Sequence, residues 1–164
     1  MYKLLPILLL LSTPALSEET AGSLNIDTGR VTVSGISAGG QMAHQLHISY
    51  SDMFSGAGMI ASGPFGCADG SLATAMARCM GKTDNPIPVA ELAESINTAA
   101  EQGLVADTKN LADDPVWLFH GTLDTTVAAQ VNDAAQALYA EFIPAEQITY
   151  VNDVAAIHNF PASG

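Results

Sequence analysis

The stretch Arg30-Val-Thr-Val-Ser-Gly-Ile-Ser-Ala-Gly39 decides the fold, because a short apolar strand runs directly into a cluster of small residues around a serine. Its last five residues fit the pattern G-x-S-x-G, which is informative between the end of a strand and the start of a helix. The strained backbone of a serine at such a turn is tolerated where Gly35 and Gly39 have no side chains to collide. We therefore predict that Ser37 is a nucleophile and that the Ala38 N–H stabilises an oxyanion beside it.

Strands and helices alternate along the rest of the chain. Strands are predicted at 30–36, 56–61, 116–120 and 148–151, and helices at 38–50, 89–102 and 128–142. In the helix after the serine, Met42, Leu46 and Ile48 are expected to be buried. Residues 62–88 contain three prolines and little periodicity, and they predict a long excursion outside the core. The alternation predicts an α/β fold in which a parallel sheet is flanked by helices.

A serine hydroxyl is a weak nucleophile and needs a base within hydrogen-bond reach, which a carboxylate orients in turn. In α/β hydrolases the order along the chain is serine, acid, histidine, and the acid lies in a loop after a strand. Asp124 lies just beyond the strand that ends at His120, and His158 lies in a loop after the strand that ends at Val151. The order and the positions predict a triad of Ser37, Asp124 and His158.

The remaining histidines and nearby acids are weaker candidates for the triad. His44 and His47 lie in the helix after the serine, where histidines more often decorate a surface or fill space. His120 ends a strand, and a structural role in ordering the acid loop is expected of it. Asp133 lies within a helix and Asp153 lies nearer the base, so each is less suited than Asp124 to be the acid of the triad.

The N-terminal residues 1–17 have the features of a secretory signal peptide. Lys3 supplies a positive charge, Leu4–Leu11 is an apolar run, and small residues follow near the end of the segment. The apolar run is shorter than the roughly 20 residues that cross a bilayer. Residues 18–164 are therefore expected to form a single domain that is exported and soluble, in the extracellular space or the periplasm.

The chain is acidic, with a formal net charge of −12 that becomes −13 once Lys3 is removed with the leader. Such a surface repels nucleic acid and anionic lipid and favours a neutral substrate, so neither a nucleic-acid partner nor a membrane is expected for the mature form. Cys67 and Cys79 are expected to pair as a disulfide in an oxidising compartment. A zinc site is the alternative, but two cysteines twelve residues apart with no histidine between them are poor zinc ligands.

Five motifs occur in one order along the chain: Val33-Ser-Gly-Ile-Ser-Ala-Gly-Gly-Gln-Met-Ala43, Gly63-Pro-Phe-Gly-Cys67, Cys79-Met80, Gly121-Thr-Leu-Asp-Thr-Thr-Val127 and Ile157-His-Asn-Phe-Pro161. Together they resemble the secreted poly(3-hydroxybutyrate) depolymerase family. The resemblance implies a circularly permuted α/β-hydrolase fold and hydrolysis of hydroxyalkanoate polyesters. It also implies that Ser37, Asp124 and His158 occupy the triad positions and that Cys67 is bonded to Cys79.

The chain departs from that family at its C-terminal side. Family members continue far beyond the histidine and contain further cysteines, whereas this sequence has six residues after His158. An α/β hydrolase takes a second oxyanion N–H from a loop on a strand that precedes the nucleophile strand. In a permuted fold that strand comes from the missing C-terminal side. We therefore expect the N-terminal half of a larger enzyme or a shortened homologue, with an exposed sheet edge and exposed apolar surface.

The expected reaction is ester hydrolysis through an acyl-enzyme, without a metal or an organic cofactor. Phe65, beside the cysteine pair, is a candidate for one wall of a shallow apolar groove that holds a polyester chain or a small ester. A secreted esterase of acetylated or feruloylated polysaccharide would use the same residues, and a peptidase is a weaker third reading. A non-catalytic protein that binds polyester or a partner is the alternative from another class. The oligomeric state is left open.

Overall fold

The computed structural model describes residues 25–81 and 86–161, and the predicted leader 1–17 lies outside them. Four parallel strands form one sheet in the order in which they occur along the chain. They are β1 (Val33–Ile36), β2 (Ala57–Ile60), β3 (Val116–Phe119) and β4 (Ile148–Val151). Ile36, Ile60, Phe119 and Val151 are paired across the sheet, so all four strands end level with one another. The residues that follow them therefore share one edge of the sheet.

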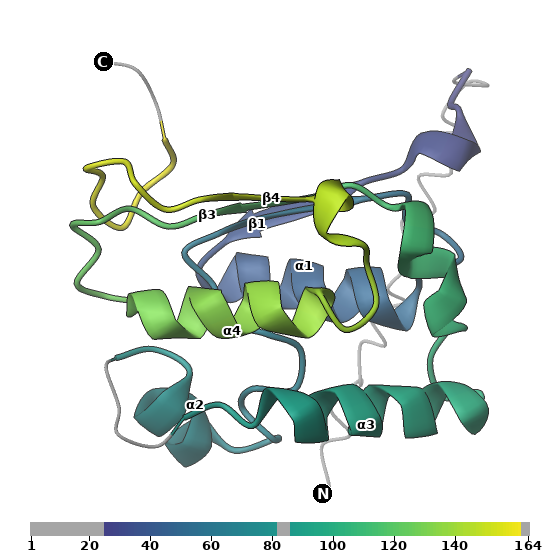
Figure 1. Cartoon of the computed structure of the whole chain (residues 1–164), viewed down its shortest axis with the longest axis horizontal. Helices are drawn as coiled ribbons and strands as arrows, with labels where there is room; N and C mark the ends of the chain where they lie inside the picture. Colours follow the sequence, from purple (N-terminus) through teal and green to yellow (C-terminus); the bar gives the residue numbers. More distant parts are fainter. Residues whose placement is uncertain (1–24, 82–85, 162–164) are drawn as a thin grey trace, which may run out of the picture.

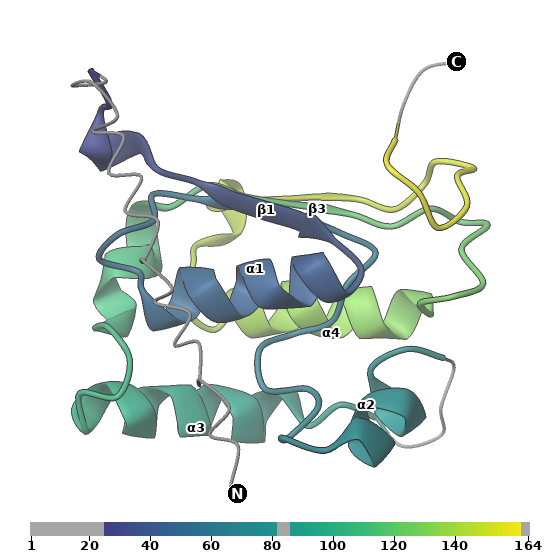
Figure 2. The same cartoon turned by 180° about the vertical axis from the view of Figure 1, so that it is seen from behind.

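Helices cover one face of this sheet (Figures 1 and 2). They are α1 (Ala38–Ser49), α2 (Leu72–Arg78), α3 (Val89–Glu101) and α4 (Ala129–Tyr139). Short 3-10 helices at Thr28–Arg30, Thr108–Asp113 and Ala145–Gln147 precede β1, β3 and β4. Because the strands follow one another in one direction and crossovers between parallel strands are right-handed, the connecting helices fall on the same side. The predicted α/β class with a parallel sheet is confirmed. No helix in the described ranges has the length and apolar character needed to cross a membrane.

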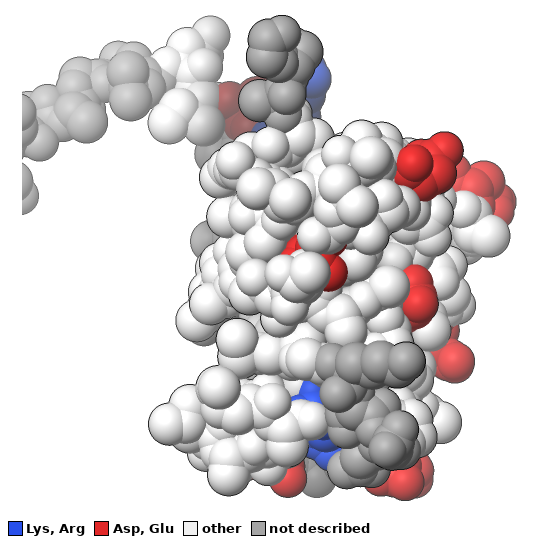
Figure 3. Space-filling model, turned by 90° about the vertical axis from the view of Figure 1, so that its left-hand side faces the viewer, with Lys and Arg blue, Asp and Glu red and all other residues white. Residues whose placement is uncertain are grey.

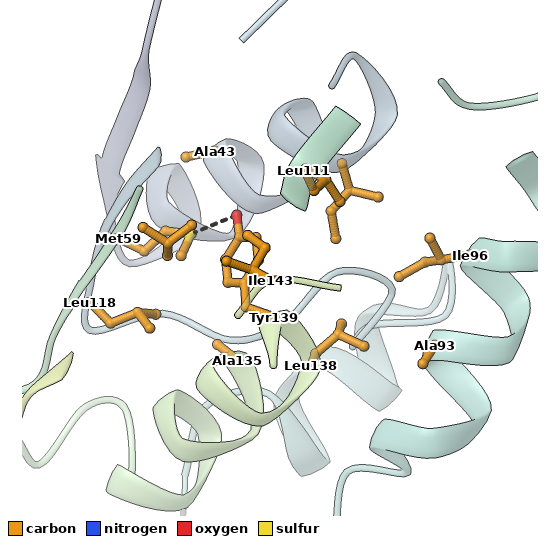
Figure 4. Packing of buried hydrophobic residues seen from close by; sticks show 12 residues of the cluster. Ala43, Met59, Ala93, Ile96, Leu111, Leu118, Ala135, Leu138, Tyr139 and Ile143 are labelled. Atoms are coloured by element: carbon orange, nitrogen blue, oxygen red, sulfur yellow. Dashed lines mark hydrogen bonds between the residues drawn. The ribbon is translucent and has the colours of Figure 1, made fainter. Parts of the chain in front are cut away.

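The main core lies between the sheet and the first layer of helices. Met59 of β2 and Leu118 of β3 point from the sheet toward α1 and α4, and both are fully buried. Tyr139, at the end of α4, lies at the centre of this cluster (Figure 4). Ile96 extends the core to α3, which contacts α4 and forms a second helical layer together with α2.

No helix of the described residues covers the opposite face of the sheet (Figure 2). Eight residues alternate onto that face and none is charged: Ser34, Ile36, Gly58, Ile60, Trp117, Phe119, Thr149 and Val151. Trp117 stacks on Phe119 with ring centroids 5.8 Å apart and keeps 36% of its surface exposed. Parallel sheets are normally covered on both faces. Trp117 is the one large apolar side chain of this face that is exposed, whereas Ile60 and Phe119 are buried in a small cluster against which Ile36, Val151 and Ala156 pack. The exposed apolar surface expected from the sequence is therefore limited on this face to the region of Trp117.

The region 62–88, predicted as a long excursion outside the core, contains the short helix α2, which was not predicted and which buries no residue. Ser71 begins α2 as a capping residue, because its hydroxyl accepts from the Thr74 N–H at 3.2 Å. Serine at this position satisfies an N–H that the first helical turn leaves without an internal partner. The 7-residue helix is too short to show a periodic pattern among the surrounding prolines and glycines.

On α1, Ile48 is buried as predicted and Leu46 is half-buried, but the prediction for Met42 is wrong. Met42 is 57% exposed, whereas the buried positions of the helix are Gly40, Ala43, His44, His47 and Ile48. These positions follow the spacing of three and four residues that places side chains on one face of a helix. Polar histidines therefore occupy core positions, which an apolar pattern alone does not reveal.

Candidate active site

Ser37 joins the end of β1 to the start of α1 in a conformation that side chains rarely adopt. Its φ is 56° and its ψ is −125°, and its N–H donates to the Ile60 carbonyl at 2.9 Å. A residue held in such a region costs roughly 1–3 kcal/mol and persists where the surrounding structure fixes it. The strain and the half-buried position of Ser37 are those of a nucleophile elbow.

The close packing around the elbow depends on Gly35 and Gly40. A methyl group added at Gly35 would collide with the backbone of Gly39, and one added at Gly40 would lie 2.7 Å from Cβ of Ser62. A methyl group at Gly39 would meet no atom within 4 Å. The prediction that Gly39 must lack a side chain is therefore wrong, because the second tight contact involves the next residue, where α1 passes the end of β2.

The first N–H groups of α1 are available to a ligand. Ala38 is exposed at the first position of the helix, and the Ser37 side chain does not cap it. Among the described residues no acceptor faces the Ala38 N–H. A free N–H at a helix N-terminus favours negative charge. The geometry is suited to one half of an oxyanion hole, and the prediction for Ala38 stays a prediction.

Asp124 lies in the loop after β3 with its carboxylate fully enclosed, since its side chain is 0% exposed. One oxygen, Oδ1, accepts from the N–H groups of Thr126 at 2.8 Å and Val127 at 3.0 Å. The other, Oδ2, accepts from Nδ1–H of His158 at 2.8 Å. Burial works against ionisation, but these hydrogen bonds outweigh it and hold the pKa of Asp124 below its ordinary value.

The contact with Asp124 determines which nitrogen of His158 carries the proton. A carboxylate accepts only, so Nδ1 of the neutral imidazole is the donor and Nε2 keeps its lone pair. The side chain of His158 is 22% exposed, which leaves the ring open to solvent on one side. An imidazole held in this tautomer by a buried carboxylate is suited to act as a general base, and the assignment of His158 to a triad stays a prediction.

Two loops hold the acid and the histidine together. The N–H of Thr122 donates to the Val154 carbonyl at 2.8 Å, and the N–H of Leu123 donates to the Ala156 carbonyl at 3.1 Å. Gly121 makes this approach possible, because a methyl group there would overlap the carbonyl of Ala156. The loops after β3 and β4 thus continue the pairing of the two strands beyond the sheet.

The structure brings Asp124 and His158 into direct contact and places Ser37 on the same edge of the sheet, after β1. Between the described residues no hydrogen bond joins the Ser37 hydroxyl to His158. Such bonds are often long in a free enzyme and shorten when substrate is bound. Figure 3 faces the side of the molecule that carries these loops, where uncharged atoms predominate and acidic side chains gather mainly toward one margin.

The two histidines of α1, His44 and His47, are buried away from solvent and cannot serve as the base in place of His158. Nε2–H of His47 donates to Asp114 at 3.1 Å, and Nδ1 lies 3.0 Å from the Tyr139 hydroxyl. The ring of His44 stacks on Tyr139 with centroids 4.0 Å apart. Burial, with a smaller contribution from His47, lowers the pKa of His44 to about 3. Of the two roles predicted for these histidines, the structure shows filling of space.

The rival acids also have other roles or none in the site. The Tyr150 hydroxyl donates to Asp133 at 2.8 Å, so this carboxylate faces β4 rather than His158. Asp153 is exposed. His120 lies in the acid loop, and Nε2 of its ring is 2.9 Å from the Val127 carbonyl oxygen. Sequence reasoning had no signal for the network of His47, Asp114 and Tyr139, because its members come from distant segments.

The cysteine pair forms a disulfide that closes the loop containing α2. Nε of Arg78 donates to the Cys67 carbonyl at 2.8 Å, and the amide of Gln41 donates to the Cys79 carbonyl at 3.3 Å. This loop is therefore tied to α1 just after the elbow. Phe65 packs against the main core, and its predicted contact with substrate stays a prediction. Nowhere in the described ranges do three or more side chains gather that could hold a metal ion.

The family model described as esterase PHB depolymerase matches residues 12–148, a range that includes Ser37 and Asp124 and ends before His158. The poly(3-hydroxybutyrate) depolymerase of Delftia acidovorans is 46% identical over 137 residues, which cover 83% of this chain and 28% of that protein. The polyhydroxybutyrate depolymerase of Talaromyces funiculosus is 33% identical over 140 residues, which cover 85% of this chain and 40% of that protein. The chain thus spans less than half the length of these relatives.

Solved structures show the same relationship. The PHB depolymerase from Penicillium funiculosum superposes with a TM-score of 0.76 at 30% identity, over 85% of this chain and 42% of that chain. The acyl-protein thioesterase 2 of Zea mays has a TM-score of 0.52 at 12% identity, over 79% of this chain and 49% of that chain, a likeness in fold alone.

Proposed function

Since this chain belongs to the PHB depolymerase esterase family, we propose that it hydrolyses poly(3-hydroxybutyrate) or a related hydroxyalkanoate polyester, with Ser37 as the nucleophile. The observation that carries the proposal is the 2.8 Å contact between His158 and the enclosed Asp124 carboxylate, on the sheet edge where Ser37 occupies a strained turn. A solved PHB depolymerase that is similar to this chain is complexed with an R3HB trimer, which supports a polyester as the substrate.

In the proposed mechanism, Nε2 of His158 takes the proton of the Ser37 hydroxyl as the oxygen attacks an ester carbonyl. Asp124 holds the imidazole and stabilises the imidazolium that forms. The Ala38 N–H stabilises the oxyanion of the tetrahedral intermediate. His158 then returns the proton to the leaving alcohol, and water hydrolyses the acyl-enzyme through the same base, which frees Ser37.

The charge of the chain is consistent with a neutral polymer. With a formal net charge of −12, the protein repels an anionic polymer but not an uncharged polyester. A polymer outside the cell requires export, and the leader-like residues 1–17 support an extracellular or periplasmic location. The uncharged polymer and the extracellular or periplasmic location are both parts of the proposal.

Hydrolysis of p-nitrophenyl butyrate by the purified chain, with Ser37→Ala as the blank, tests the proposal. We expect release of p-nitrophenol that the substitution abolishes, because no other residue of the site supplies a nucleophile at the elbow. Removal of a triad member typically costs several orders of magnitude in kcat. Turbid films of poly(3-hydroxybutyrate) then test the polymer, with feruloylated polysaccharide as the competing substrate.

Because the chain spans less than half the length of its relatives, an absence of hydrolysis would also be informative. A folded chain that shows no hydrolysis above the Ser37→Ala blank would contradict the proposed activity. Retention of the same chain on polyester granules would then favour a non-catalytic binding protein. Clearing of ferulate esters without clearing of the polyester would instead place the substrate among polysaccharide esters.

A further inference from the structure

His120 links the end of β3 to the far side of the loop that carries Asp124. Its backbone N–H donates to the Val151 carbonyl at 2.9 Å, which continues the pairing of β3 with β4. The side chain is 5% exposed, and Nε2 lies 2.9 Å from the carbonyl oxygen of Val127. The ring therefore spans the interior of the loop, from the residue after β3 to Val127, shortly before α4 begins.

The partner of His120 identifies the nitrogen that carries its proton. A peptide carbonyl only accepts hydrogen bonds, so Nε2 must donate to Val127. The same N–H lies 3.9 Å from Oδ2 of Asp124, the oxygen that binds His158. Because Nε2 is committed to the carbonyl, His120 cannot take a proton from a substrate or from Ser37 through that atom.

Val127 is held from both sides by this arrangement. Its N–H donates to Oδ1 of Asp124 at 3.0 Å, while its carbonyl accepts from His120. Its own side chain is 2% exposed. A shift of Val127 therefore moves one of the two backbone groups that fix the carboxylate of Asp124.

We infer that His120 is a positioning residue for the acid of the triad: its Nε2–H fixes Val127, and Val127 fixes the carboxylate that orients His158. The placement is independent of substrate. Only its consequence for ester hydrolysis rests on the proposed function.

Two substitutions of His120 by amide side chains of different length distinguish a positioning role of the ring from a role in filling space. Glutamine in His120→Gln presents an N–H near the position of Nε2, whereas the shorter side chain in His120→Asn does not reach Val127. The reporter is the tautomer of each ring in the ¹⁵N-histidine NMR spectrum of the full chain at mildly alkaline pH. In the unsubstituted protein we expect Nε2–H for His120 and Nδ1–H for His158. The Nδ1–H tautomer of His158 should persist in His120→Gln, whereas His158 should be a mixture of the two tautomers in His120→Asn.

Ester hydrolysis provides the second readout. We expect kcat to fall about 10-fold to 100-fold in His120→Asn with KM nearly unchanged, the scale of a small displacement of a catalytic group. His120→Gln should recover most of the loss. In an Asp124→Asn background, His120→Asn should cause no further fall in kcat, because the effects of substituting two residues that act through one contact are not additive.

Several outcomes separate this inference from the proposed function. A His120 ring that carries its proton on Nδ1 in the unsubstituted protein overturns the inference without any variant. So does a folded His120→Asn protein in which His158 keeps a single Nδ1–H tautomer. A chain without esterase activity whose His158 tautomer still responds to His120→Asn supports the inference and contradicts the proposed function.

Discussion

Substitution of Gly121 by alanine should separate the two loops that hold the acid and the histidine of the triad. The added methyl group would lie 2.6 Å from the carbonyl carbon and 2.9 Å from the Cβ of Ala156, and closer still to the carbonyl oxygen. These are mostly backbone atoms, so no rotation of a side chain relieves the overlap. One of the two loops has to move.

The magnitude follows from what that movement breaks. Overpacking in a tight site costs about 1–3 kcal/mol. The bond from the Leu123 N–H to the Ala156 carbonyl would be strained or lost, at about 0.5–1.5 kcal/mol for a typical hydrogen bond. We therefore expect Gly121→Ala to lower the free energy of unfolding by about 2–4 kcal/mol. Because a displacement of about 1 Å near a catalytic group can cost 100-fold, kcat should fall on that scale.

Urea unfolding and hydrolysis of p-nitrophenyl butyrate measure the two effects. Gly81→Ala is the matched control, because a methyl group at Gly81 meets no atom within 4 Å and its φ lies outside the left-handed region. We expect that control to stay within about 0.5 kcal/mol of the unsubstituted chain. A Gly121→Ala protein that matches the control in both stability and kcat would refute the argument that the close approach of the loops positions the triad.

Three further predictions follow from the contacts around the elbow and the core. Gly40→Ala should lower the free energy of unfolding by about 1–3 kcal/mol through its collision with Ser62, whereas Gly39→Ala should leave it within about 0.5 kcal/mol, as measured by urea unfolding. Replacing Cys67 and Cys79 together by serine should cost about 2–4 kcal/mol, because the closed loop restricts the unfolded chain; an unchanged midpoint of thermal unfolding would contradict this. The pKa of His44, about 3 in the folded state against 6.5 in the unfolded state, makes unfolding take up a proton, so stability should be full above pH 6.5 and decline as the pH falls toward 3. His44→Phe should remove much of that decline in urea titrations at several pH values, and an unchanged pH dependence would show that this ring does not cause it.

The sheet and the meeting of Asp124 with His158 could be predicted because their signals are local. Each strand is a short apolar run bounded by turn residues, and Val116–Phe119 is the plainest of them. Asp124 and His158 each follow a strand, and carboxyl ends of parallel strands share an edge. The order of these residues along the chain was therefore enough to anticipate the contact of 2.8 Å between them.

The interior of α1 could not be predicted in the same way. A pattern of apolar residues favours Met42 as a buried position. His47 is buried instead because its hydrogen-bond partners, Tyr139 and Asp114, come from segments far along the chain, and His44 is buried beside it, stacked on the Tyr139 ring. The hydrogen bonds of both ring nitrogens offset the cost of burying the polar His47 ring. The need for a small residue at Gly40 likewise depends on Ser62 in the next strand connection.

The described residues account for one part of the site, the orientation of His158, and leave another part open, the second oxyanion donor. Orientation of His158 depends on the loops after β3 and β4, and both loops contact each other directly. On the open face of the sheet, Trp117 is exposed, while Ile60 and Phe119 pack against Ala156 of the loop after β4. No other segment of the described residues supplies a second oxyanion donor, because only the first turn of α1 presents free N–H groups at the elbow. The tautomer of His158 and the turnover of an ester therefore report on two separable parts of the same site, and a chain with the first and without the second would possess an oriented base and an incomplete oxyanion hole.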